Sequence, residues 1–228
     1  MKSKRGLSVI AVCGLVLGIM AISASGAQAG KWMVNKANIA TGVSLNGTMS
    51  ATAEGGSITL LSTSGANSVA ISCPTILVVV IMLATTLHIA LIFHGCTTKI
   101  NGTANAGCNP TNKPGIEANL TDEPVLHEGG KYVKALGVGG VFATLKFNEE
   151  TCVALSPSIK LTGTGWLEDC NNEFETEKVT HLVQVAKVPA EKLGGLLFGG
   201  NKATIDGSVN LAFNDETHKG MTFSGLAE

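Results

Sequence analysis

The chain has 228 residues, of which 14% are charged and only 4% are aromatic. Its first 29 residues carry three of the 16 basic residues and none of the 17 acidic ones, so the remainder has a net charge of 13 − 17 = −4. This mildly acidic balance argues against nucleic acid or an anionic membrane as a partner. The 28 glycines, together with abundant Ser, Thr, Asn and Val, favour short strands and turns over long helices.

Residues 1–29 have the three parts of a secretory signal peptide. A basic start is followed by an uncharged apolar run over residues 7–22 and then by small and polar residues. Ala27 and Ala29 provide the small-x-small pattern that signal peptidase accepts. We therefore expect cleavage between Ala29 and Gly30, which leaves residues 30–228 as a single β-rich domain outside the cytoplasm.

A short glycine motif recurs in the mature part. Asn46-Gly47, Asn101-Gly102 and Asp206-Gly207 each lie between apolar and hydroxyl-bearing residues. Asn-Gly and Asp-Gly favour tight turns because both residues tolerate positive φ. The copies are spaced too irregularly for a repeat architecture. Each copy is expected to mark a turn or a glycine-containing strand.

The segment 76–93 is the most apolar stretch after the signal peptide. It contains no Asp, Glu, Lys or Arg, so hydropathy alone allows a transmembrane helix. Its first half is rich in β-branched residues, and Thr85 and Thr86 interrupt it where a hairpin turn would fall. Two consecutive buried strands are the preferred interpretation. The alternative is a membrane span, and only that alternative gives the protein a membrane contact.

Alternation of apolar and polar residues predicts further strands at 57–61, 141–147, 178–185 and 203–213. In the last of these, Ile205, Val209, Leu211 and Phe213 fall on one face. A helical turn is expected only within 186–197. The predicted fold is an all-β, disulfide-bearing antiparallel β-sandwich of Ig-like or jelly-roll-like type, with little helix apart from the signal peptide.

The mature chain has five cysteines, namely Cys73, Cys96, Cys108, Cys152 and Cys170. In an oxidising compartment they are expected to form two disulfides and leave one thiol over. Cys152 and Cys170 flank one candidate hairpin, and Cys73 and Cys96 frame the apolar segment, so these two pairs are favoured. Cys108 is then the odd cysteine, through which a disulfide-linked partner could attach. Other connectivities stay open.

The sequence shows no recognisable catalytic constellation. The histidines lack metal-binding helical spacing, and Gly-x-Ser-x-Gly is absent. His94 and Cys96 could supply two metal ligands only if Cys96 were reduced. Paired carboxylates occur without the aromatic residues that line most sugar sites. No cofactor, metal or catalytic residue is expected from these patterns.

Four stretches resemble a group of secreted bacterial proteins of unknown function, over most of the mature chain. They are 30–32 (GKW), 94–96 (HGC), 174–182 (FETEKVTHL) and 203–208 (ATIDGS). The resemblance implies export and supplies no catalytic residues. The preferred hypothesis is a non-enzymatic structural or ligand-binding module of the cell envelope or extracellular space. The alternatives are a secreted hydrolase without a sequence motif and an envelope protein tethered through 76–93.

Overall fold

The computed structural model describes residues 30–35, 37–127, 130–169, 181–185 and 195–226. Within them the chain forms antiparallel strands and a short 3-10 turn, η1 (Ala106–Cys108). No helix in this part of the chain is long and apolar enough to cross a membrane. The strands are β1 (Lys31–Val34), β2 (Ala37–Asn38), β3 (Leu45–Ser64), β4 (Asn67–Cys73), β5 (Thr75–Met82), β6 (Leu87–His94), β7 (Thr97–Ile100), β8 (Thr103–Ala104), β9 (Ile116–His127), β10 (Gly130–Lys146), β11 (Ser158–Asp169), β12 (His181–Val185), β13 (Leu196–Phe198), β14 (Asn201–Phe213) and β15 (Phe223–Leu226).

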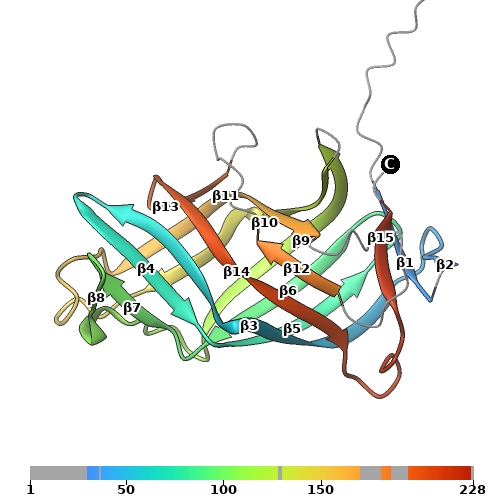
Figure 1. Cartoon of the computed structure of the whole chain (residues 1–228), viewed down its shortest axis with the longest axis horizontal. Coiled ribbons are helices and arrows are strands. Elements are labelled where there is room, and N and C mark those ends of the chain that lie inside the picture. Colours follow the sequence, from blue (N-terminus) through green and yellow to red (C-terminus); the bar gives the residue numbers. More distant parts are fainter. Residues whose placement is uncertain (1–29, 36, 128–129, 170–180, 186–194, 227–228) are drawn as a thin grey trace, which may run out of the picture.

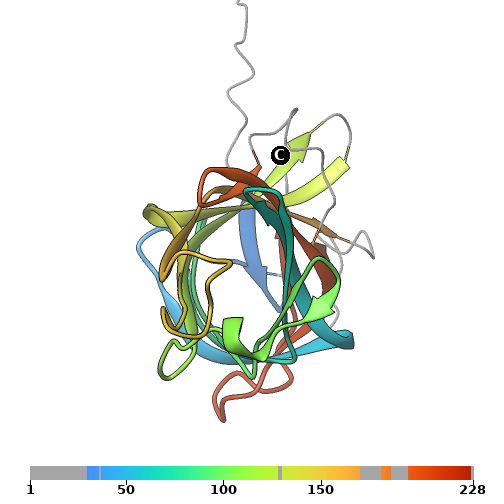
Figure 2. The same ribbon diagram turned by 90° about the vertical axis from the view of Figure 1, so that its left-hand side faces the viewer.

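Most of these strands form one sheet that closes on itself (Figures 1 and 2). Around the ring, β3 pairs with β5, β5 with β6, β6 with β9, β9 with β10 and β10 with β11. Strand β11 pairs with both β12 and β13, and these pair with β14. Strand β14 then pairs with β3, which closes the ring. Strands β1, β2 and β15 form a separate small sheet at one end of the molecule.

Strand β3 runs the whole length of the closed sheet and bends on the way. Its first part pairs with β5 and its last part with β4. Opposite β14, the pairing moves from Glu54↔Ser208 to Thr59↔Asp206, which is five residue steps on β3 against two on β14. The three additional residues form a bulge, and a bulge increases local bending and twist. This bend lets one strand serve as the seam of the closure.

The apolar segment 76–93 folds as two adjacent strands, which confirms the predicted strand pair, but each strand buries only one face and not both as expected. The Leu83 N–H donates to the Thr86 carbonyl over 2.8 Å, and this contact closes the turn between β5 and β6. Val78 and Val80 point into the core, whereas Leu77 and Val79 are 54% and 50% exposed. Because these residues are strands with one face outward, the alternative of a membrane-spanning helix is wrong for this segment.

The inward side chains of the closed sheet make one continuous apolar core. A cavity of about 50 Å³ lies within it and is lined by Ile58, Phe93, Phe142 and other apolar side chains. A cavity this small and apolar is expected to stay dry and is too small for an organic ligand. This cavity is therefore a small packing gap in the core rather than a ligand site.

The predicted all-β, antiparallel and disulfide-bearing class is confirmed. Opposite walls pack their apolar faces together as the layers of a sandwich do, and the pairing of β14 with β3 joins the walls into a single sheet. The predicted strands 57–61 and 203–213 lie in β3 and β14, and 141–146 lie in β10. Residues 178–180 and 186–194, and with them most of the range in which a helical turn was expected, lie outside the described part, whereas Leu196–Phe198 is a strand.

The first predicted disulfide is present, between Cys73 and Cys96. Strands β4 and β5 follow each other almost directly, and their partners β7 and β6 do the same. The disulfide joins these two junctions, where Ser72 pairs with Thr97 and Thr75 with His94. It therefore links neighbouring strands at the place where the pairing changes from β4 with β7 to β5 with β6.

The second predicted disulfide is wrong. Cys152 is bonded to Cys108, with a Cα–Cα distance of 4.6 Å, so Cys152 does not pair with Cys170 and Cys108 is not the odd cysteine. Cys152 lies in the loop after β10, and Cys108 ends η1, which follows β8. The two loops meet at one end of the closed sheet, an arrangement that depends on the fold rather than on separation along the chain. Cys170 lies outside the described residues.

Candidate functional site

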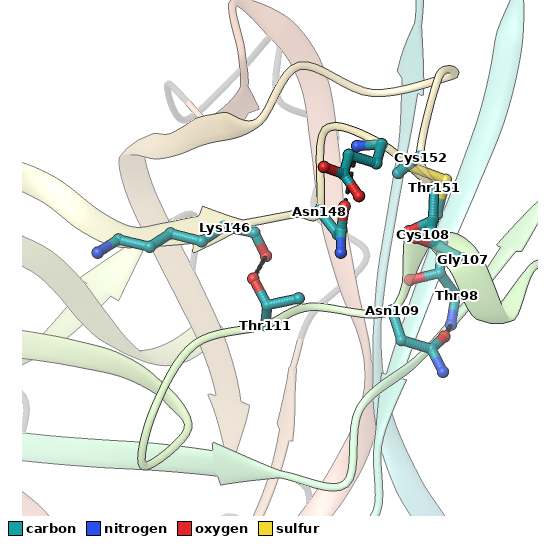
Figure 3. Close-up of a disulfide and its surroundings, with 10 residues drawn as sticks. Thr98, Gly107, Cys108, Asn109, Thr111, Lys146, Asn148, Thr151 and Cys152 are labelled. Carbon is teal, nitrogen blue, oxygen red and sulfur yellow. Dashed lines mark hydrogen bonds between the residues drawn. A yellow bond between two sulfur atoms is a disulfide. The ribbon is translucent and has the colours of Figure 1, made fainter.

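The Cys108–Cys152 disulfide anchors two loops at one end of the sheet (Figure 3). The Thr151 hydroxyl donates to the Gly107 carbonyl over 2.8 Å, and the Cys152 N–H donates to the Asn148 carbonyl over 2.9 Å. On the η1 side, the Asn109 side chain accepts the Thr98 N–H over 2.8 Å. Covalent and hydrogen bonds together fix the start of the segment that leads from η1 to β9.

This segment is also attached to β10 through a side-chain amide. Asn112 Nδ2 donates to the Thr144 carbonyl and Asn112 Oδ1 accepts the Lys146 N–H, both over 2.8 Å. The Thr111 N–H donates to the Lys146 carbonyl over 2.8 Å, and Figure 3 shows the Lys146 side chain extending away from the disulfide. The Asn112 amide thus takes the place of a paired strand residue beside β10. Lys113, next in the chain, is held at the rim of a groove.

A bulge in β10 forms the other side of this groove. The pairing with β9 moves from Gly137↔Leu120 to Ala143↔Ala118, which is six residue steps on β10 against two on β9. The chain folds back so closely that a Cβ at Gly137 would overlap the backbone of Val141, so glycine is required there. Val138, at the tip, is 58% exposed. The bulge therefore stands out from the sheet as a wall.

Between the anchored segment and the bulge lies an open groove of about 750 Å³. Strands β9 and β10 contribute exposed Glu117, Asn119 and Lys146 to it. The residues that line it are Thr111, Asn112, Lys113, Gly115, Glu117, Asn119, Val138, Val141, Phe142, Ala143, Thr144 and Lys146. Its volume is within the range of small-molecule sites, and polar groups converge on it from three chain segments.

The charged side chains of the groove give it a local positive balance. Lys113, Glu117 and Lys146 are exposed and contribute a net charge of +1, on a chain whose formal net charge is −1. The Asn119 amide and the Thr144 hydroxyl add hydrogen-bonding groups between them. Ammonium groups bind carboxylates through charge-assisted hydrogen bonds. The groove is suited to a polar ligand that carries an anionic group.

A second unusual feature is Asp122, on the inward face of β9. Its side chain is only 3% exposed, and Oδ1 lacks a hydrogen-bond partner. Burial raises the pKa of Asp122 to about 8. It pairs in register with Leu87 on β6 and Ala135 on β10, and the Trp32 indole N–H donates to its backbone carbonyl over 3.4 Å. Asp122 therefore belongs to the core and is separate from the groove.

Asp215 and His218 form a third polar cluster, which is a local turn. Asp215 Oδ1 accepts the N–H groups of Thr217 and His218 and lies 2.6 Å from His218 Nδ1. Partial desolvation acts to raise the pKa of Asp215, but hydrogen bonds from Thr48 and His218 outweigh it and lower the pKa. These contacts cap the end of β14 and fix its connection to β15.

Of the residues singled out from the sequence, four form the two disulfides, and none lines the groove. Cys96 is oxidised and cannot join His94 as a metal ligand. No group of three metal-ligating side chains occurs among the residues that the structure describes. The groove residues carry little sequence signal, because they are ordinary polar residues brought together by a bulge and a loop. Asp122 does carry a sequence signal, because it is an acidic residue at an inward position, in the same alternation as Ala118, Leu120 and Pro124.

Comparison of the chain with protein-family models, with curated proteins and with solved structures finds no match.

Proposed function

We propose that the protein is an exported, non-enzymatic binding module of the cell envelope or extracellular space, whose groove takes a polar ligand bearing a carboxylate. The observation that carries this proposal is the groove itself, with Lys113 and Lys146 beside hydrogen-bonding side chains on the paired strands β9 and β10. Its walls are fixed by the Cys108–Cys152 disulfide and by the Asn112 amide. Such preorganisation lowers the entropic cost of binding.

The groove's composition favours binding over hydrolysis. Its lining includes one carboxylate, Glu117, and no histidine, cysteine or serine. A glycosidase of the usual kind needs two carboxylates across the scissile bond, and a catalytic triad needs a histidine base. Lysine, threonine and amide side chains can hold a ligand without activating water.

Export is supported by two independent features. The Ala27 and Ala29 pattern predicts signal-peptide cleavage before Gly30. The two disulfides, Cys73–Cys96 and Cys108–Cys152, belong to an oxidising compartment. Together they support the proposal that the groove lies outside the cytoplasm.

The test is a nuclear magnetic resonance titration of the exported protein with two carboxylate-bearing probes. Galacturonic acid oligomers and short peptides with a free C-terminal carboxylate share the proposed chemistry and distinguish a saccharide from a peptide source. Backbone shifts are expected at Lys113, Glu117 and Lys146. Shifts confined to surfaces away from these residues, or no binding of either probe, would count against the proposal.

Matched variants sharpen this test. The Lys146→Gln substitution removes one charge from the groove and is expected to weaken binding by about 10-fold or more, because a charge-assisted hydrogen bond contributes about 1.5–3 kcal/mol. The Lys99→Gln substitution makes the same charge change on exposed β7, outside the groove, and is expected to leave affinity unchanged. Equal effects of both variants would indicate nonspecific electrostatics.

A further inference from the structure

A buried carboxyl group, that of Asp122, lies toward the end of the closed sheet opposite the Cys108–Cys152 disulfide. Asp122 has the only acidic or basic side chain among the described residues that are buried, and its Oδ1 has no hydrogen-bond partner. A buried carboxylate without a partner is strongly destabilising, because desolvation is not compensated. A proton on the carboxyl group or a neighbouring cation would offset this cost.

The first residue expected in the mature chain lies against β9, two residues along the strand from Asp122. Gly30 is buried, and its backbone nitrogen donates to the Pro124 carbonyl over 3.2 Å. Asp122 and Pro124 both face inward and are two residues apart on β9, a spacing of about 6.6 Å along a strand. Trp32 continues this contact, because its backbone N–H donates to the Ala84 carbonyl and its indole to the Asp122 carbonyl. Strand β1 is thus fixed along the part of β9 that carries Asp122.

We propose that cleavage before Gly30 creates the missing cation, so that the new α-ammonium group of Gly30 forms a buried ion pair with the Asp122 carboxylate. The step is hydrolysis of the Ala29–Gly30 peptide bond by the exporting cell's signal peptidase. Water adds across the bond, Ala29 leaves with the carboxylate, and Gly30 keeps the amine, which takes up a proton. The inference rests on the export that we propose and is independent of the groove.

The Gly30 nitrogen has more hydrogen-bond donors after cleavage than before it. As a peptide nitrogen, Gly30 has one N–H, which is used by the Pro124 carbonyl. As an ammonium group it has three, and two remain to reach toward Asp122. A neighbouring cation favours the ionised form of a carboxylic acid. Processing therefore converts an unpaired buried acid into one half of an ion pair.

Other charged groups near Asp122 point elsewhere. Glu123 and Lys134 alternate with inward residues on β9 and β10 and pair with each other in register, so they lie on the outer face. His88 is on the exposed face of β6, and Lys31 alternates with the buried Trp32 on β1. On the inward side, the neighbours of Asp122 from the packed strands are the apolar side chains of Leu87, Ala135 and Trp32. The Gly30 amine is the one charge that processing adds at this end.

The experiment uses the full-length precursor exported and processed by a bacterial host, with intact mass to establish where the mature chain starts. A second precursor carries one serine inserted between Ala29 and Gly30, so that the processed chain starts one residue earlier and its amine is displaced. The chain that starts at Gly30 is expected to have an unfolding equilibrium constant at least about 10-fold smaller at pH 7, measured by urea denaturation. The Asp122→Asn substitution is expected to abolish most of this difference, whereas Glu123→Gln, on the outer face, is expected to preserve it.

A second readout reports the amine directly. Acetylation by a reagent selective for α-amines at neutral pH is expected to be slow in the native chain that starts at Gly30 and faster after Asp122→Asn. Equal stability of the chain that starts at Gly30 and the chain with the inserted serine would overturn the ion pair. A difference in stability that persists in Asp122→Asn would also overturn it. A mature chain that starts at another residue would overturn it as well. The binding titration of the groove is separate, so a failure there leaves this result standing.

Discussion

The carboxyl group of Asp122 has a defined effect on stability wherever no cation faces it. Burial raises its pKa from 3.8 to about 8. Below pH 4 the group is protonated in both the folded and unfolded chains and costs nothing. Between about 4 and 8 the unfolded chain releases the proton and the folded chain retains it, so stability falls as pH rises. Above about 8 both states are ionised and the cost stays constant.

This fall in stability with rising pH gives a prediction for the chain with a serine inserted before Gly30. Its free energy of unfolding, measured by urea denaturation, is expected to decrease steadily from pH 4 to pH 8. Asp122→Asn is expected to flatten the profile and to stabilise this chain at pH 7 by up to about 4 kcal/mol. In the chain that starts at Gly30, the ammonium group is expected to lower the pKa of Asp122 and remove the slope. A steep slope that survives Asp122→Asn would assign the pH dependence to other groups.

At the same scale, the recurring Asn-Gly motif shows what a residue pattern can predict. Asn101 and Gly102 form the turn between β7 and β8, with φ of +52° and +79°. Asn46-Gly47 and Asp206-Gly207 instead lie inside β3 and β14. At Gly47 a Cβ would lie 2.9 Å from Asp215 Oδ2 and 3.3 Å from the Phe213 ring, so this glycine leaves room for side chains that are distant in sequence. The dipeptide predicts that glycine is needed, while the reason depends on residues far along the chain.

At the scale of elements, β5 offers a direct test of register. Val79 and Val80 are adjacent, but Val79 is half exposed and Val80 is fully buried. Val80→Lys is expected to destabilise the protein by at least about 4 kcal/mol, because it buries an unpaired charge. Val79→Lys, on the outer face, is expected to cost less than about 1 kcal/mol. Urea denaturation of both variants measures the difference, and similar costs would contradict the assigned register.

Alternation predicted parts of β3, β10, β12 and β14, because alternating apolar residues mark a strand that buries one side. The pattern of Ile205, Val209, Leu211 and Phe213 identifies the inward face of β14 from the sequence alone. Alternation says nothing about which strand pairs with which. The bulges of β3 and β10 are equally hidden, because they appear only as a mismatch with the partner strand. For this reason the class could be predicted, whereas the closure and the groove could not.

At the scale of the whole molecule, the Cys108–Cys152 disulfide fixes the end of the sheet that carries the groove. It spans 44 residues of sequence, for which the chain-entropy model gives about 4 kcal/mol of stabilisation. Replacing both cysteines with alanine is expected to lower the free energy of unfolding by about this amount and to weaken binding in the groove, because Lys113 loses its anchored segment. Urea denaturation and the probe titration measure the two effects.

Peptide mapping without reduction checks the connectivity itself. A linked pair of peptides containing Cys108 and Cys152 is the expected product, and a Cys152–Cys170 pair would contradict the structure. The sequence favoured Cys152–Cys170 because these cysteines flank a candidate hairpin. The closed sheet overrides that preference by bringing the loops after β8 and β10 to one end.

The pairing of β1 with β15 has a practical consequence for handling the protein. Lys31 lies opposite Leu226, so both ends of the described fold are next to the last part of β9, whereas the groove is beside its first part. A molecule fixed to a sensor chip through a tag after residue 228 would hold its groove away from the surface and accessible to ligand in flow. The same tag leaves the Gly30 amine untouched, so one immobilised preparation serves both for screening ligands and for comparing chains with different starts.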